Sequence, residues 1–291
     1  MSIVELKDLC FTYGKKTPYE IKAIDGVSLS IEENLITGII GHTGSGKSTL
    51  IQMLNGLLRP DSGEVIVDGE NIWEKPKKIG KIRHKVGMVM QYPEYQLFAE
   101  TVREDIAYGP KNIGLSPDEI DKRVKQSLEF CGLFADILDK SPFDLSGGQR
   151  RRVALAGVMA MNPKLLVLDE PAAGLDPKGR REILGGIKEY QKKSGTSVII
   201  VSHSMEDMAM YCDRVLVMSH AKAIAYGTCE EVFSQGELLE GAGLDVPEIT
   251  KIALALRKNG VDIPKSIYTV DGAYEAIKAL MPSQDREGGV G

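Results

Sequence analysis

Hydrophobic and polar residues alternate in short stretches near the beginning of the chain, a pattern typical of half-buried β-strands. This alternation predicts strands over Ser2–Leu6 and Tyr19–Leu29, the second folded around a turn at Asp25-Gly26. Ile36–Ile40 is a compact apolar strand, and Val65–Gly69 has the pattern of a hairpin edge. The first part of the chain is therefore expected to be rich in β-structure.

Helical spacing replaces this alternation in two places. Apolar residues after Thr49 recur at intervals of three and four and stop near Gly56, which predicts a helix there. The chain is again mostly helical over about residues 96–160, where Ser116 and Glu119 form a capping box with proline at the first helical position. We expect this second region to be a helical subdomain.

Two later apolar runs, Leu165–Leu168 and Val198–Val201, are short and contain no polar residue. Such runs are typical of parallel strands that are buried on both faces, with helices between them. Together with the strand, loop and helix near residue 40, they predict an α/β fold. Its expected core is a mixed sheet with an antiparallel β edge and a helical insertion.

The pattern changes again from about residue 241. One predicted helical face follows Pro247, and a second one lies farther along the chain. We therefore divide the chain into a domain over residues 1–240 and a small helical appendage over 241–291 that ends in a polar, disordered tail from residue 282. The two faces consist of Ile249, Ile252, Ala253 and Leu256, and of Ala273, Tyr274, Ile277 and Leu280.

Composition narrows the classes of protein to consider. A net charge of −5 over 291 residues argues against nucleic acid as a partner, and the four separated cysteines are expected to be reduced thiols. No apolar run approaches the ~20 residues that a membrane-spanning helix needs. The first ten residues include acidic ones where a signal peptide would be apolar. We expect no direct membrane insertion, so that any role at a membrane requires a partner.

The segment from Gly41 to Ser48 matches the phosphate-binding loop pattern GxxxxGK[ST]. Its glycines allow backbone N–H groups to point at phosphate oxygens, and the following helix adds the positive end of its dipole. Lys47 is expected to contact the β- and γ-phosphates and Ser48 to ligate Mg²⁺, while His42 has no catalytic role. The predicted ATP-binding residues here are those of the loop and the residue that follows it, namely Gly41, His42, Thr43, Gly44, Ser45, Gly46, Lys47, Ser48 and Thr49.

The predicted strand at Leu165–Leu168 runs directly into two carboxylates. A buried charge at the end of a strand is costly unless it is paired or binds a metal ion, so Asp169 is predicted to belong to the Mg²⁺ site. Glu170 is predicted to be the base that orients and deprotonates the attacking water. Taken alone, Glu170 could equally be a charge at the start of a helix before Pro171.

A second glycine-rich element, Leu145 to Gln149, reads Leu-Ser-Gly-Gly-Gln ahead of a helix predicted over Arg150–Met159. Ser146 and two glycines before a helix form a further anion-binding terminus, although they could also be a simple cap. The chain already has one phosphate loop, so this element is expected to serve a nucleotide held elsewhere. With these motifs the sequence resembles the ATP-binding-cassette (ABC) family.

That resemblance implies two subunits packed head to tail, each closing over the ATP bound to the other. Asp176 would lie in the loop that crosses the interface. The residues expected to contact ATP on the partner are Ser146, Gly147, Gly148, Gln149 and Asp176.

Three further positions are similar to functional residues of the family. Tyr13 resembles the aromatic residue that stacks on adenine, and Gln91 the glutamine that joins the Mg²⁺ shell and senses the membrane partner. His203 resembles the histidine that contacts the γ-phosphate and positions the water. Taken alone, Tyr13 would be read as a core residue and His203 as a loop histidine.

The motif spacing separates the classes of ABC protein. A single cassette without coiled coils, zinc ligands or membrane spans argues against ribosome-acting, DNA-repair and exporter members. Finer features resemble the ATPases of energy-coupling factor (ECF) vitamin importers, above all the second ATPase of their heterodimeric pair; a cobalt or nickel importer of the same group is the alternative. The segments that carry this resemblance are Gln91–Phe98, Tyr108–Gly114, Ser141–Phe143, Arg151–Ala154 and His203–Asp207.

The resemblance also implies partners and a location. A second ABC ATPase, a transmembrane coupling subunit and a substrate-binding membrane subunit would hold the chain at the cytoplasmic face of the cell membrane. The appendage would help to join the two ATPases, or would only cover its own domain. Tyr92, Tyr95, Leu97 and Phe98 would contact the coupling subunit, unless they only pack within their loop.

Overall fold

The structure is a computed structural model that describes residues 1–264 and 266–280. Its centre is a six-stranded sheet in the order β10-β9-β3-β8-β7-β6, in which only the β9–β10 pair is antiparallel. The strands are β3 (Ile36–Ile40), β6 (Val86–Val89), β7 (Leu165–Asp169), β8 (Ser197–Val201), β9 (Arg214–Ser219) and β10 (Lys222–Thr228).

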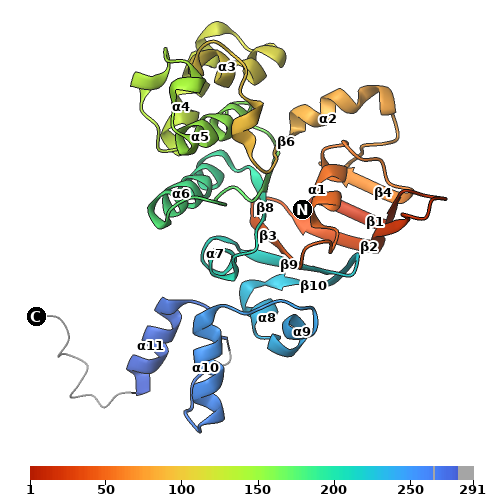
Figure 1. The fold of residues 1–291 in the computed structure, drawn as a ribbon, viewed down its shortest axis with the longest axis vertical. Helices are drawn as coiled ribbons and strands as arrows, with labels where there is room; N and C mark the ends of the chain where they lie inside the picture. Colours follow the sequence, from red (N-terminus) through yellow and green to blue (C-terminus); the bar gives the residue numbers. More distant parts are fainter. Residues whose placement is uncertain (265, 281–291) are drawn as a thin grey trace, which may run out of the picture.

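A second, antiparallel sheet lies beside the central one (Figure 1). Its order is β2-β1-β4-β5, and its strands are β1 (Ser2–Tyr13), β2 (Ile21–Glu32), β4 (Ser62–Val67) and β5 (Glu70–Asn71).

The predicted turn at Asp25-Gly26 is wrong, because β2 runs through it. Leu9 pairs with Val27 and Phe11 with Ile24, so β2 carries one extra residue at this point. Gly26 has a φ of 63°, which suits a β-bulge. The same residues that favour turns therefore bend this strand without ending it.

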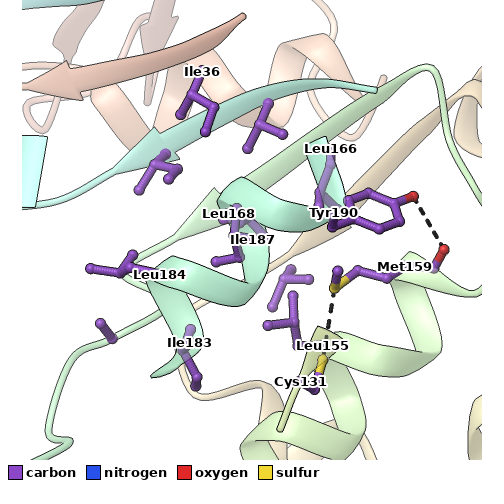
Figure 2. Packing of buried hydrophobic residues seen from close by; sticks show 14 of the residues in the cluster. Ile36, Cys131, Leu155, Met159, Leu166, Leu168, Ile183, Leu184, Ile187 and Tyr190 are labelled. Atoms are coloured by element: carbon purple, nitrogen blue, oxygen red, sulfur yellow. Dashed lines mark hydrogen bonds between the residues drawn. The ribbon is translucent and has the colours of Figure 1, made fainter. Parts of the chain in front are cut away.

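Alternate residues of the central strands face two different cores, as the period of a strand requires. Leu165 and Val167 of β7 pack with the antiparallel sheet and α1 (Lys47–Leu54), while Leu166 and Leu168 pack with the helices on the opposite face. Figure 2 shows part of the core on the helical face, where the Tyr190 hydroxyl donates to the Met159 carbonyl at 3.3 Å.

The helical subdomain stands at one end of the central sheet (Figure 1). It contains α3 (Val102–Asn112), α4 (Pro117–Phe130) and α5 (Gly147–Met159). Ser116 caps α4 by accepting from the Glu119 N–H at 3.4 Å, and the Glu119 carboxylate pairs with Arg123. Other helices are α2 (Ile79–Lys85), α6 (Pro177–Ser194), α7 (Met205–Tyr211), α8 (Cys229–Phe233) and α9 (Gly236–Gly241).

Helices α10 (Glu248–Lys258) and α11 (Val270–Leu280) lie in the range predicted for the appendage and have a small core of their own. Ala253 and Ala273 are buried in it, whereas Ile252 and Tyr274 are exposed, so the two predicted faces are only partly covered. The division into two domains stays a prediction, and the tail predicted from residue 282 lies outside the described residues. Within the described part, no helix has the length and apolar character that crossing a membrane demands.

Candidate functional site

The phosphate-binding loop joins β3 to α1 and is shaped by two crowded glycines. A Cβ atom on Gly41 would lie 2.4 Å from the Met218 carbonyl oxygen, and one on Gly46 would lie 2.3 Å from the Ala23 carbonyl oxygen. Gly46 also has a φ of 104°, a conformation that side chains disfavour. The loop therefore requires glycine at both positions for steric reasons, as its predicted role demands.

Lys47 is the first residue of α1, and its side chain turns back across the loop. Its Nζ donates to the carbonyl oxygens of Gly41 at 2.6 Å and His42 at 3.0 Å. Burial lowers the pKa of this amine below its ordinary value, against the opposing effect of Glu170 and Asp169. The ammonium is thus held at the loop by neutral carbonyls, where an anionic ligand would relieve its desolvation.

A cavity of about 450 Å³ opens at this loop, and we call it the phosphate-loop cavity. Residues from five separate parts of the sequence line it. The predicted site residues in its wall are Tyr13, Thr43, Gly44, Gly46, Lys47, Ser48, Thr49, Gln91, Asp169, Glu170 and His203.

The remaining loop residues, Gly41, His42 and Ser45, do not line this cavity. Conversely, Ile21 and Ala23 of β2 do line it and were not predicted. The pairing of Tyr13 with Ile21 across β1 and β2 explains their presence, because it places the start of β2 beside the tyrosine. The sequence showed only an apolar stretch soon after Tyr13. The strand register is needed to see that this stretch lies beside the tyrosine.

The two carboxylates at the end of β7 are largely buried. Asp169 is the last strand residue, and Glu170 follows with a φ of 52° while its N–H still donates to the Val201 carbonyl of β8 at 2.9 Å. Such a left-handed conformation is uncommon for a residue with a side chain, and it aims Glu170 at the cavity.

Electrostatics distinguish these groups from surface acids. Burial raises the pKa of Asp169, and burial together with the neighbouring Asp169 raises that of Glu170. Glu170 Oε1 is buried without a hydrogen-bond partner among the described residues, and His203 Nε2 lies 3.6 Å from it. Burial lowers the pKa of His203. A carboxylate with a raised pKa beside an imidazole with a lowered one is suited to accept a proton from water.

The Leu-Ser-Gly-Gly-Gln element lines a different cavity of about 500 Å³, which we call the signature cavity. Ser146 caps α5 by accepting from the Gln149 N–H at 3.3 Å, while Gln149 Oε1 accepts from the Ser146 N–H at 3.0 Å. This reciprocal cap starts the helix at Gly147, three residues before the predicted Arg150. Gly148 lines the cavity, whereas Gly147 does not.

Asp176 lies in the wall of the signature cavity and caps α6, where its Oδ1 accepts from the Gly179 N–H at 2.7 Å. Among the described residues, the two cavities share no lining residue. The chain from Glu170 to Asp176 connects one to the other. The structure therefore groups the predicted trans residues apart from the phosphate-binding loop.

The loop Gln91–Phe98 lies between the central sheet and the helical subdomain. Gln91 reaches the phosphate-loop cavity, while Leu97 and Phe98 line a groove of about 300 Å³ with residues of α3 and α5. Tyr95 is 84% exposed and Phe98 61%, but Leu97 is buried. Of the four apolar residues predicted to contact a partner, the three aromatic ones thus present open surface, whereas Leu97 packs inward.

Comparison with known proteins settles the family. The model of the ABC transporter family matches residues 24–173, which is 150 of the 291 positions. The chain belongs to the ABC transporter family. The predicted α/β fold of an ABC-type ATPase is confirmed by this match and by the solved structures below.

Curated ABC relatives agree over almost the whole chain. The energy-coupling factor transporter ATP-binding protein EcfA2 of Clostridium acetobutylicum is 51% identical, over 97% of this chain and 99% of its own. EcfA2 of Clostridium perfringens is 53% identical, over 96% and 98%. These relatives confirm the predicted resemblance to the second ATPase of the ECF pair.

Two solved ABC structures share the fold. The cbiO1 protein of Clostridium perfringens, described as part of the ABC transporter complex cbiONQ, has a TM-score of 0.74 at 39% identity and covers 89% of this chain and 97% of its own. The cassette MJ0796, solved as a dimer after hydrolysis with ADP and Pi bound, has a TM-score of 0.70 at 29% identity and covers 78% and 98%.

Proposed function

We propose that this ABC protein is the ATP-binding and ATP-hydrolysing subunit of an energy-coupling factor importer and powers uptake of a vitamin or micronutrient through transmembrane partners. One observation carries the proposal. A single cavity gathers a phosphate-binding lysine, two carboxylates and a histidine, while the second anion-binding helix terminus opens into a cavity of its own. This arrangement suits a cassette that needs a second one to complete its site.

Hydrolysis of ATP is assigned to the phosphate-loop cavity. Lys47 and the loop N–H groups neutralise and orient the phosphates, and Tyr13 stacks on the adenine. Glu170 takes the proton of the attacking water, and His203 orients that water toward the γ-phosphate. Because phosphoryl transfer mainly requires positioning and neutralisation of charge, these groups are sufficient on the side of one chain.

The donor set of the cavity also fits Mg²⁺, which favours oxygen ligands. The Ser48 hydroxyl, the Gln91 amide and the Asp169 carboxylate all lie in its wall, and Asp169 is a buried acid whose pKa burial raises. A cation would stabilise the ionised form of this acid. When bound, Mg²⁺ would supply positive charge at the β- and γ-phosphates.

The second half of the nucleotide site is assigned to a neighbouring ABC ATPase, in a heterodimer. Ser146, Gly147, Gly148 and Gln149 would bind the γ-phosphate of ATP held by the partner, with Asp176 at the interface. The dimer of the MJ0796 cassette, which bears ADP and Pi, supports this assignment by analogy. The appendage formed by α10 and α11 is proposed to extend the same interface.

The membrane partner is assigned to the groove beside Gln91–Phe98. Phe98 lines this groove and Tyr95 lies on the same loop, and both exposed aromatic side chains have the character of a surface that binds an apolar helix. The chain would then lie at the cytoplasmic face of the cell membrane as a peripheral subunit, next to a coupling subunit and a substrate-binding subunit. The similarity to cbiO1 of the cbiONQ complex keeps a cobalt or nickel importer as the second candidate.

Purification of the full-length chain from detergent-solubilised membranes tests the proposal. The partners are identified by mass spectrometry, and MgATP turnover is measured on the recovered complex. We expect a second ABC ATPase and polytopic membrane proteins to be recovered with the chain. Full turnover by a chain that remains monomeric would contradict the shared site, and recovery without any membrane protein would contradict the role in transport.

A further inference from the structure

Arg151 connects three segments that the proposed mechanism uses separately. It lies in α5, five residues after the capping Ser146, and its side chain is only 7% exposed. Nε and Nη2 of its guanidinium donate to Glu94 Oε2 at 3.1 Å and Oε1 at 3.2 Å. Nη1 donates to the Ala173 carbonyl oxygen. One side chain therefore joins the loop Gln91–Phe98 to the chain that follows Glu170.

The chemistry of this contact requires arginine. A guanidinium presents several donors in one plane and can bind a carboxylate through two of them while another reaches a third group. Burial opposes ionisation of Glu94, yet the hydrogen bonds from Arg151 lower the pKa of that carboxyl below its ordinary value. The Arg151 Cζ also lies over the Tyr92 ring, 6.0 Å from its centroid.

Stability alone is a weak reason for such a pair. Removing both charges from water costs free energy that their attraction does little more than offset, so an apolar pair would hold these segments equally well. What the pair adds is a fixed geometry between segments that are far apart in sequence: Glu94 lies 57 residues before Arg151, and Ala173 lies 22 after it.

The connection continues from Ala173 to the proposed base. The Ala173 N–H donates to the Glu170 carbonyl oxygen at 3.2 Å and closes the turn in which Glu170 has its left-handed backbone. Moving the Ala173 carbonyl would therefore rotate this turn and move the Glu170 carboxylate within the cavity. A shift of about 1 Å at a reacting group is enough to lower a rate by roughly 100-fold.

We propose that Arg151 is a positioning residue that holds the Glu170 turn in place and ties it to the loop Gln91–Phe98, so that a membrane partner bound at this loop changes the rate of ATP hydrolysis. The link between Arg151 and Glu170 stands on the contacts above. The effect of the partner rests in addition on the proposed function, which assigns the docking surface to the same loop.

The first test is Arg151→Lys in the full-length chain, purified as the complex described above and supplied with MgATP. Lysine keeps the charge but cannot bind both Glu94 oxygens and the Ala173 carbonyl. We expect kcat to fall about tenfold, while KM for ATP stays within about twofold because the phosphate-binding loop is untouched. An unchanged kcat would overturn the proposal. A tenfold fall in kcat/KM that comes from a higher KM for ATP would overturn it as well.

Arg123→Lys is the matched control. Arg123 also pairs with a carboxylate, that of Glu119 at 2.9 Å, and donates to a backbone carbonyl two residues beyond the end of α5, that of Met161 at 3.0 Å. It touches neither of the two loops in question. We expect this variant to keep the kcat of the parent chain, and an equal loss in both variants would reduce the role of Arg151 to helix packing.

If Arg151→Lys does not fold, Glu94→Gln decides the question. Its amide oxygen can still accept one hydrogen bond from Arg151, and the bond to Ala173 remains, so kcat should fall by roughly threefold at constant KM. A parental kcat in this variant would overturn the proposal.

The partner effect is measured as the ratio of turnover with and without the membrane subunits. Arg151→Lys should lower this ratio. A parent complex that shows no stimulation would refute the docking surface while leaving the kcat loss of Arg151→Lys intact. If Arg151→Lys keeps the parental ratio of turnover with and without the membrane subunits, Arg151 does not transmit the effect of a partner bound at the loop Gln91–Phe98.

Discussion

The phosphate-loop cavity and the signature cavity differ in how far their polar groups are satisfied within the chain. In the first, Glu170 has a buried oxygen without a hydrogen-bond partner among the described residues and a left-handed backbone. In the second, Ser146 and Gln149 cap each other, and Asp176 caps α6. The first cavity therefore holds a buried carboxylate in a costly environment, as catalytic groups often are, whereas the second contains a satisfied helix cap, which we propose faces a neighbouring ABC ATPase.

This contrast teaches where each kind of substitution should act. Changes in the phosphate-loop cavity should alter the chemical step and its dependence on pH. Changes in the signature cavity should alter turnover only when two cassettes are joined, and they should also cost the stability of a helix cap.

The largest effect is expected from Glu170→Gln. Loss of the proposed base should lower kcat by roughly 100- to 10,000-fold, while ATP binding remains because Lys47 and its loop are unchanged. The trapped nucleotide should then favour a closed dimer, which size-exclusion chromatography with MgATP would detect. Turnover near that of the parent chain would remove Glu170 from the role of base.

Ser146→Ala should have the next largest effect. The loss of the trans contact should lower turnover of the assembled pair by roughly 10- to 100-fold without weakening the binding of ATP to the isolated chain. Ser116→Ala is the matched control, because the Ser116 side chain also caps a helix, α4, by accepting from the N–H three residues later, and Ser116 lines neither cavity. Both variants should lose about 1 kcal/mol of stability, but only Ser146→Ala should lose turnover.

If Ser116→Ala loses as much turnover as Ser146→Ala, the signature cavity has no special role and the two-chain site is contradicted. Thermal unfolding of both variants beside the parent chain checks that the two caps contribute equally to stability.

The smallest effect concerns the stability of the chain as a function of pH. Because burial raises the pKa of Asp169 and Glu170 in the folded chain, the folded state binds their protons more tightly than the unfolded state. Their contribution to stability is therefore fully present below the unfolded pKa values and is lost as pH rises through the folded ones. Because glutamine does not ionise, Glu170→Gln should remove the part of this pH-dependent loss of stability that Glu170 causes.

Urea unfolding at pH 5 and pH 7.5, without nucleotide, measures this prediction. The variant should gain stability relative to the parent chain as pH rises. If the gain in the free energy of unfolding is larger at pH 5 than at pH 7.5, burial does not disfavour the ionised form of the Glu170 carboxylate, and the prediction is wrong. Ser146→Ala, which removes no titratable group, should shift stability by the same amount at both pH values.

The phosphate-binding loop, the strand that ends in Asp169 and the Leu-Ser-Gly-Gly-Gln element could be predicted because each is a local pattern with a local cause. The pattern at Asp25-Gly26 misled, since a turn and a bulge both use a glycine with positive φ. Only pairing with β1 decides between the two.

Contacts between distant segments could not be predicted in this way. Ile21 enters the cavity wall through the register of two strands, and Arg151 meets Glu94 and Ala173 through the packing of α5 against two loops. Neither contact leaves a periodic signal in the sequence. The site was therefore readable as a set of motifs, whereas the connections among the motifs needed the fold.

The adjacency of β7 and β8 has a consequence for engineering. Asp169 is paired with Val201, and the Glu170 N–H donates to the carbonyl of that valine, so the backbone of the proposed base is tied to the strand that ends two residues before His203. Sliding one strand by a residue would exchange the inward and outward faces and displace both groups together. Grafting the proposed hydrolytic site onto another protein would therefore require transfer of β7 and β8 together, with their register unchanged.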